Sequence, residues 1–314
     1  MGFYILSYLC FTVFILAAGH LIYRQWTLPI HLRWEIYPVQ HETTDKLAHG
    51  GSYMEELNWW EKRHRGSWLN EMKYMVPEIL FIRGLWKENR GLWWVSFPFH
   101  FGLYLMIVTF GLMVLHALVI LWGGNTVPAG GAIRTLLHGF IVFTGWTGLV
   151  LGGIGSVGTF CRRLADPELR EYSSFADYFN ILFILIFFLF AFFVCLFGDP
   201  LLEGAKAYVF GLLTGGGSLN AYVPGQSFCG GVAIVLASLL VAYVPMTHMS
   251  HMFMKYFLYH NVKWDDAPNL RGGKIEAAIQ KNLELKPTWQ AKHVEADGRK
   301  SWRDISSLPP KETK

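Results

Sequence analysis

Residues 97–116 read FPFHFGLYLMIVTFGLMVLH, a run of twenty positions without one charged side chain. A helix of about 20 apolar residues rises about 30 Å, which is the thickness of the hydrocarbon layer of a bilayer. The run belongs to one of five segments with this character, at residues 2–23, 93–122, 133–157, 177–198 and 228–257. The sequence therefore predicts an all-α protein, an integral membrane bundle of five helices.

The composition excludes several other classes of protein. Hydrophobic residues make up 53% of the 314 positions and charged residues only 16%, whereas a soluble domain carries about a quarter charged residues. The four cysteines show no metal-cluster spacing, and three of them lie in apolar runs, which argues against a disulfide-stapled secreted fold. The net charge of +4 is a weak argument for nucleic acid. We expect a lipid bilayer and no nucleic acid as partner.

The basic residues predict the orientation of the bundle. Of the 27 Lys and Arg residues, 25 flank the spans on one side, and only Arg134 and Lys206 fall on the other. Positively charged loops stay in the cytoplasm, so we expect the N-terminus outside the cell (inner) membrane and the C-terminal tail in the cytoplasm. A cleaved signal peptide is the alternative for the first span, but residues 1–10 lack the basic start that it needs.

This topology divides the chain into four parts. They are a first helix at 1–23, a cytoplasmic segment with interfacial helices at 24–92, a four-helix core at 93–257 and a cytoplasmic arm at 258–314. Residues 24–91 contain six Trp residues, and the run 69–86 is apolar enough to lie in the membrane interface or to dock a partner. Residues 262–314 are polar, and we expect an extended arm that becomes ordered on a partner.

Histidines are the notable ionisable residues of the spans. Six lie in or at them: His20, His100, His116, His138, His248 and His251. His116 follows His100 by 16 residues, which is about 24 Å along a helix. With the predicted topology, His116 and His138 share an outer layer. His100, His248 and His251 share an inner layer, and His20 ends the first span on that same side.

Two histidine layers from neighbouring helices match what two b-type haems require, because each iron takes one imidazole from either side. His100 and His116 point about 160° apart around their helix, so each can face a different neighbour. The spans contain none of the carboxylates that a proton relay needs, which disfavours that alternative. The other alternative is a set of buried, neutral histidines bonded to neighbouring helices.

The remaining polar groups have accessory roles in this interpretation. His20 and whichever of His248 and His251 is not a ligand would bond haem propionates or the backbone. Arg134 and His138 are the candidates for an outer quinone pocket, and Arg134 is equally suited to pair with a propionate. A c-type haem is not encoded, since no Cys-x-x-Cys-His motif occurs.

The chain resembles the gamma subunit of respiratory nitrate reductase and its relatives, over roughly residues 90–260. These relatives are the membrane cytochrome b subunits of sulfite-reduction-associated, transmembrane redox and heterodisulfide-reductase-like complexes. The resemblance rests on FHFG at 99–102, GG at 152–153, CRRLADPELR at 161–170, AD at 176–177 and PMTHMSH at 245–251. It implies a five-helix subunit with two b haems that exchanges electrons with membrane quinone (menaquinone) and with a cytoplasmic iron–sulfur subunit.

The resemblance also implies ligands, with two departures. By position, His100 and His251 match the inner haem pair of the family. In the nitrate reductase pattern the last helix supplies an outer histidine too, but residues 228–243 contain none, which leaves His138 as the partner of His116. The long segment 24–91 is absent from the nitrate reductase subunit and argues for relatives with a heterodisulfide-reductase-like partner.

We therefore expect a di-haem electron-transfer subunit of a quinol or quinone oxidoreductase. One alternative keeps the haems but not the quinone, as an electron conduit from an external multihaem cytochrome c. Another is a haem-free membrane scaffold or transporter. A transporter should show interrupted helices related by an internal repeat, and no half of the sequence resembles the other.

Overall fold

The computed structural model describes residues 1–27, 40–49, 57–62, 66–123, 131–216, 227–260, 264, 269–289, 294 and 296–307. In these residues every regular element is a helix. The chain forms two compact units, the first from residues 1–18 and 73–249 and the second from residues 19–72 and 250–314.

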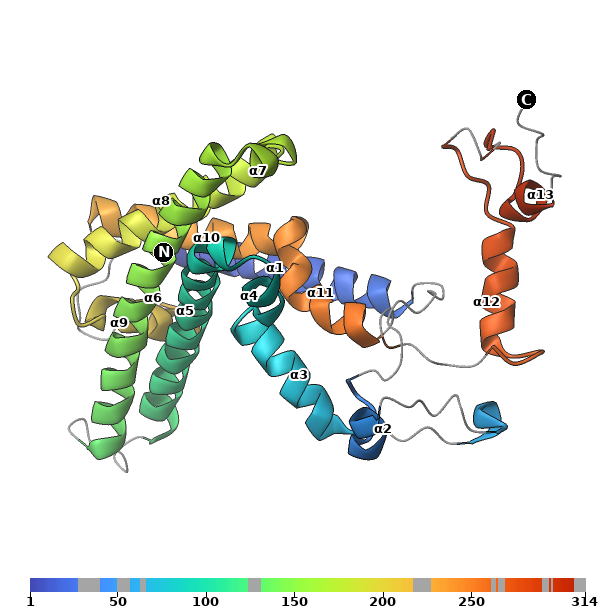
Figure 1. The fold of residues 1–314 in the computed structure, drawn as a ribbon. Helices are drawn as coiled ribbons and strands as arrows, with labels where there is room; N and C mark the ends of the chain where they lie inside the picture. The colour runs from blue at the N-terminus through green and yellow to red at the C-terminus, as the bar shows by residue number, and fades with distance from the viewer. Residues whose placement is uncertain are drawn as a thin grey trace. The chain divides into compact units, whose positions relative to one another are not determined.

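Among the described residues, five helices are long and apolar enough to cross a membrane, which confirms the predicted all-α bundle and a multi-pass membrane protein (Figure 1). They are α1 (Gly2–Trp26), α5 (Arg90–Gly123), α6 (Ala132–Ala165), α8 (Phe175–Phe197) and the span Phe228–Met246, in which η5 (Val244–Met246) extends α10 (Phe228–Tyr243). Hydropathy alone located these spans, because each needs a long apolar run.

Glycines set the contact between α5 and α6. A Cβ atom at Gly102 of α5 would overlap the backbone of Gly152 of α6, and a Cβ at Gly155 would overlap the backbone of Phe99. Helix α8 also packs at this contact, because its Phe188 is 1% exposed and fills the space beside Gly152. Small residues allow close backbone approach in membranes, where apolar burial does not favour one neighbour over lipid.

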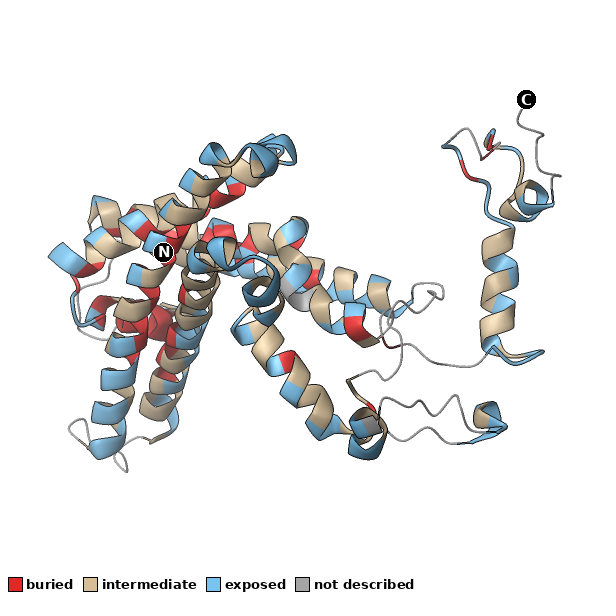
Figure 2. Ribbon diagram, in the orientation of Figure 1, coloured by how far each residue is buried: buried red, intermediate tan, exposed pale blue. Residues whose placement is uncertain are grey.

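The short helix α9 (Glu203–Thr214) lies between the fourth and fifth spans and was not predicted. It has 12 residues, too few to cross a bilayer, yet Gly204 and all positions of 206–211 are buried (Figure 2). It packs against α5. The Tyr208 ring stacks on Tyr4 of α1 at 4.9 Å. Ser7 of α1 bonds both the Tyr208 hydroxyl at 2.9 Å and Ser238 of α10 at 2.7 Å.

The fifth span is shorter than the sequence predicted. We expected it to continue to residue 257, but it ends at Met246. Pro245 has no N–H for a helical bond, and Thr247 is extended, with φ −124° and ψ 175°. The chain continues as the turn η6 (His248–Ser250) and then α11 (His251–Leu258). The two histidines after the break therefore lie in different elements, His248 in η6 and His251 at the start of α11.

The remaining described elements are short. Those before the second span are α2 (Thr44–His49), η2 (Trp59–Glu61), α3 (Trp68–Leu80) and α4 (Arg83–Glu88), and α7 (Pro167–Glu171) precedes α8. At the start of α5, the Trp93 indole donates to the Phe81 carbonyl at 2.7 Å, which ties the end of α3 to the second span.

The C-terminal arm is folded where the structure describes it, instead of extended. It contains α12 (Lys274–Leu283) and α13 (Trp302–Ser306). The rings of Trp289 and Trp302 lie 5.8 Å apart, and Arg303 bonds Gln280 at 2.8 Å. These contacts join α12, α13 and the segment between them, although Trp289 is 54% exposed and neither helix contains a buried residue.

Candidate functional site

His100 lies half-buried on α5, and its hydrogen bond fixes the protonation of the ring. The Nδ1 atom is 2.8 Å from the carbonyl oxygen of Ser96, one turn earlier on the same helix. A carbonyl only accepts, so Nδ1 must carry the hydrogen and Nε2 keeps the lone pair of the neutral ring. A metal-ligating histidine usually has this arrangement, with its second nitrogen donating to a carbonyl or carboxylate. The geometry of His100 thus fits an axial ligand of haem iron.

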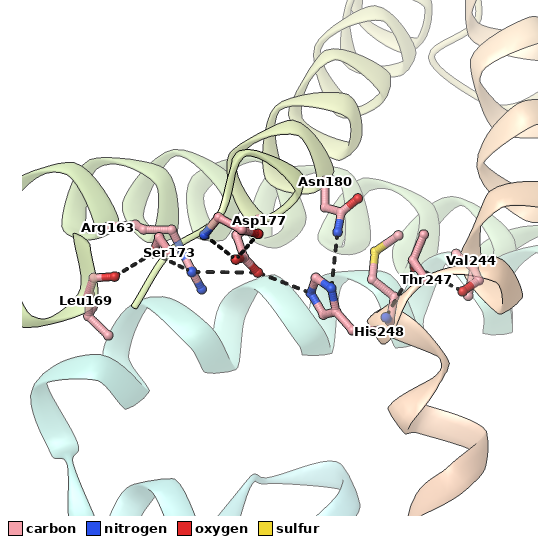
Figure 3. Close-up of polar contacts among 10 residues, drawn as sticks. Arg163, Leu169, Ser173, Asp177, Asn180, Val244, Thr247 and His248 are labelled. Atoms are coloured by element: carbon pink, nitrogen blue, oxygen red, sulfur yellow. Dashed lines mark hydrogen bonds and ion pairs between the residues drawn. The ribbon is translucent and has the colours of Figure 1, made fainter. Parts of the chain in front are cut away.

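A network of charged groups joins the end of α6 to the start of α8 (Figure 3). Asp177 accepts hydrogen bonds from the backbone N–H of Ser174 at 2.8 Å and from its hydroxyl at 2.7 Å, which caps α8. Arg163 of α6 lies 3.8 Å from the Asp177 carboxylate and donates to Ser173 at 2.7 Å. We call these residues, together with Asn180 and His248, the Asp177 network.

His248 belongs to this network. Its Nε2 lies 3.6 Å from the Asp177 carboxylate and its Nδ1 lies 3.5 Å from the amide nitrogen of Asn180. An amide nitrogen only donates, so Nδ1 accepts, and the hydrogen of the neutral ring is on Nε2 toward the carboxylate. Both ring nitrogens of His248 thus face groups of α8, which favours His251 as the ligand of this pair.

His251 and His20 both belong to the second unit. His251 is the first residue of α11, and its side chain is exposed. His20 is exposed near the end of α1. Neither side chain is enclosed in an apolar core.

The predicted outer histidines form part of a second cluster, built around a buried lysine. The Lys206 ammonium of α9 lies 2.8 Å from a carboxylate oxygen of Glu203 and 2.9 Å from Nδ1 of His138 on α6. The Lys206 side chain is 5% exposed and that of Glu203 57%. His116 of α5 interacts electrostatically with these three residues and with Arg134 of α6. We call these five residues the outer cluster, after the predicted topology.

The carboxylates of both clusters correct one step of the sequence argument. We expected no carboxylate partner for the histidines within the spans, but Asp177 in the first turn of the span α8 lies 3.6 Å from His248. Outside the spans, Glu203 lies 3.6 Å from His138. Glu203 was missed because it lies on α9, which is not a span. Its spacing of three residues from Lys206, a pair that shares a helix face, is the signal that could have revealed the ion pair. Nearby, the buried Asp199 caps α9 by accepting from the Ala205 N–H at 2.9 Å.

The outer cluster fits a haem less well than His100 does. An ammonium only donates, so Nδ1 of His138 accepts from Lys206 and the hydrogen of the neutral ring is on Nε2. In this state no nitrogen of His138 offers a lone pair to iron. The helices that carry the outer histidines also touch nearby, because the hydroxyl of Thr109 on α5 bonds that of Thr144 on α6 at 2.9 Å.

In the part of the chain that the structure describes, no group of three or more His, Cys, Asp or Glu side chains is arranged to hold a metal ion. An axial haem pair needs only two histidines. The hydrogen bonds of each histidine determine which of its ring nitrogens keeps a lone pair for iron. No family model matches the chain, and no curated protein or solved structure matches it. The described part of the chain is thus α-helical, with five helices apolar enough to span a membrane and two clusters of ionisable residues.

Proposed function

We propose that the chain is an electron-transfer subunit of a respiratory redox complex, with a b-type haem at His100. The observation that carries the proposal is the 2.8 Å bond from His100 to the Ser96 carbonyl, which leaves the ligand lone pair on Nε2. The five membrane spans support it, because a haem between such helices lies within reach of lipid-soluble substrates. When bound, the haem supplies one-electron transfer.

The second axial ligand in this proposal is His251, as the family resemblance implies. His248 is the alternative, but its two nitrogens face Asp177 and Asn180. The roles are then divided: the Ser96 carbonyl orients the His100 ring, and the Asp177 network holds the turn that contains His248.

The electron partners follow from the resemblance and from the predicted topology. We propose exchange between menaquinone or another membrane quinone and a cytoplasmic iron–sulfur subunit of the heterodisulfide-reductase-like kind. An external multihaem cytochrome c is the alternative donor. Inhibition of haem reduction by quinone analogues would distinguish the two, because only the first route passes through a quinone pocket.

A second candidate function is a haem-free transporter. The contact of Glu203 with Lys206 and His138 favours it, because buried ionisable groups in membrane bundles commonly mark ion or proton pathways.

The test is a reduced-minus-oxidised spectrum of the purified protein, with a pyridine haemochrome assay to count haem. We expect b-type haem in the wild type and its loss in His100→Ala and His251→Ala. The matched control is His248→Gln, which changes a neighbouring histidine and should keep the haem. Full haem content in His100→Ala would contradict the proposed site, and no haem in protein from haem-replete cells would favour the transporter.

A further inference from the structure

We infer that the outer cluster takes the place of a second haem: Lys206 fixes α9 to α6 through His138, and the layer binds no iron. The inference extends the proposed function, because it sets the haem content at one per chain. It departs from the two haems that the sequence and the family resemblance predict. It rests on hydrogen-bond donors, on helix packing and on burial, and these three observations are independent of the His100 site.

The two hydrogen bonds that the Lys206 ammonium donates provide the first argument. The ammonium is 5% exposed, and its two hydrogen-bond partners are Glu203 and His138. A buried charge is tolerated only when it is paired and hydrogen-bonded. If His138 turned to iron, Lys206 would lose one of two partners in an apolar surrounding. Ligation by His138 would therefore be opposed by the desolvation of the lysine.

Helix packing provides the second argument. A haem between His116 and His138 would have to lie between α5 and α6. These helices are joined by the Thr109–Thr144 hydrogen bond, which lies about two helical turns from His116 and from His138. A macrocycle with a histidine on either face would force the outer ends of the two helices apart, toward the volume that α9 occupies against α5.

The connection into α9 provides the third argument. Leu202, the residue before α9, is 6% exposed, and a Cβ atom at Gly145 of α6 would lie 2.6 Å from its side chain. Its backbone is left-handed, with φ 57° and ψ 26°, a conformation that a branched side chain adopts only when its surroundings hold it there. Leu202 and Lys206 thus attach the two ends of the first turn of α9 to α6.

The charges of the cluster agree with a structural role, in which Lys206 holds α9 against α6. Lys206 pairs with Glu203 and bonds His138, so its charge has partners on both α9 and α6. His116 of α5 interacts electrostatically with Lys206, Glu203, Arg134 and His138. The nearby buried acid Asp199 accepts a hydrogen bond from the Ala205 N–H. The hydrogen bonds of Lys206 therefore connect α9 to α6 without an external ligand.

The experiment combines haem counting with a double-mutant cycle. We expect one haem per wild-type chain, unchanged in His116→Ala and in His138→Leu. His138→Leu and Lys206→Met should each lower the thermal midpoint in detergent, and the double variant should lower it by less than the sum, because both remove one interaction. His138→Asn is the matched control. Its amide oxygen offers an acceptor near the position of Nδ1 and cannot replace an imidazole on iron, so it should restore most of the stability.

Each outcome decides the inference. Two haems in the wild type, with loss of one in His116→Ala or His138→Asn, would overturn it. Additive shifts in the cycle would also overturn it, because His138 and Lys206 would then act separately. Absence of all haem would contradict the proposed function. The double-mutant cycle alone would then decide whether the bond between Lys206 and His138 holds α9 against α6. If Lys206→Met does not fold, Lys206→Arg replaces it. The thermal midpoint of Lys206→Arg is then measured alone and in combination with His138→Asn.

Discussion

The type of hydrogen-bond partner decides the chemistry of each histidine in this protein. His100 faces a carbonyl oxygen, which can only accept, and this places the lone pair on Nε2. His138 faces an ammonium, which can only donate, and this places the lone pair on Nδ1, where it is already used. Two histidines that the sequence placed in equivalent roles are therefore different groups in the fold.

At the residue scale, Asp177→Asn tests the network that holds the turn at His248. The carboxylate accepts two bonds from Ser174 at the start of α8 and faces both Arg163 and His248. An amide of the same shape keeps one acceptor oxygen and loses the charge. We expect a loss of about 1 kcal/mol, the usual effect of a weakened helix cap, seen as a lower thermal midpoint in detergent.

The control for Asp177→Asn is Glu168→Gln, which removes a charge from an exposed residue of α7 and should leave the midpoint unchanged. Haem content should be the same in both variants. Loss of haem in Asp177→Asn would mean that His248 or its turn takes part in ligation, contrary to the assignment of His251.

The residues of the candidate site were predicted only in part. The sequence identified every histidine discussed here and also Arg134, because ionisable residues stand out in apolar runs. It did not identify Glu203 as a partner of His138, because 65 positions separate them and the contact depends on the fold of α9. Hydrogen-bond partners across helices depend on helix rotation, which hydropathy does not determine.

At the element scale, the α5–α6–α8 contact makes a sharp prediction about two adjacent glycines. A Cβ atom at Gly152 would overlap the Phe188 ring, whereas a Cβ at Gly153 would have nothing within 4 Å. We expect Gly152→Ala to lower stability by about 1–3 kcal/mol, the usual cost of overpacking. Gly153→Ala should be neutral or slightly stabilising, because alanine is the better helix former.

The measurement is the thermal midpoint of both purified variants in the same detergent. Equal midpoints for Gly152→Ala and Gly153→Ala would contradict the close approach of the three helices. The pair is informative because both substitutions add one methyl group to the same helix turn.

A second prediction at this scale concerns the attachment of α9 to α1. The Tyr208 hydroxyl donates to the Phe3 carbonyl at 3.0 Å and also bonds Ser7. Tyr208→Phe keeps the stacking on Tyr4 and removes the hydroxyl, so we expect a loss of about 0.5–1.5 kcal/mol. Tyr172→Phe, at an 84% exposed position, is the control. If both variants melt at the wild-type midpoint, the polar contacts between α1, α9 and α10 do not stabilise the bundle.

The elements were predictable to the degree that their length and hydropathy were distinctive. The first four spans begin and end within a few residues of prediction, except that α6 continues to Ala165 through its basic last turn. The fifth was predicted too long, because its apolar run conceals the break at Pro245. The helix α9 was missed because 12 residues with a lysine and a glutamate resemble an outer loop until the bundle buries them.

At the scale of the whole molecule, the proposed single haem would determine where electrons travel. In the predicted topology His100 lies toward the cytoplasmic face, and the level of His116 is about 24 Å further along α5. In the proposal no cofactor lies at the outer cluster, so electrons that enter a haem at His100 would have no relay to the outer face. Quinone and the proposed iron–sulfur partner would then both exchange electrons on the cytoplasmic side, and turnover would move no electron across the bilayer.

This consequence predicts the behaviour of the protein in sealed proteoliposomes. The orientation of the chain is set by protease access to its C-terminal tail, a membrane-soluble quinol is the donor, and ferricyanide, which does not cross the bilayer, is the acceptor. We expect ferricyanide on the tail side to be reduced in a His100-dependent manner, and ferricyanide on the opposite side to be reduced no faster than with His100→Ala. A voltage-sensitive dye should report no membrane potential. Reduction on the opposite side together with a potential would require a second relay, and the outer histidines would then be haem ligands after all.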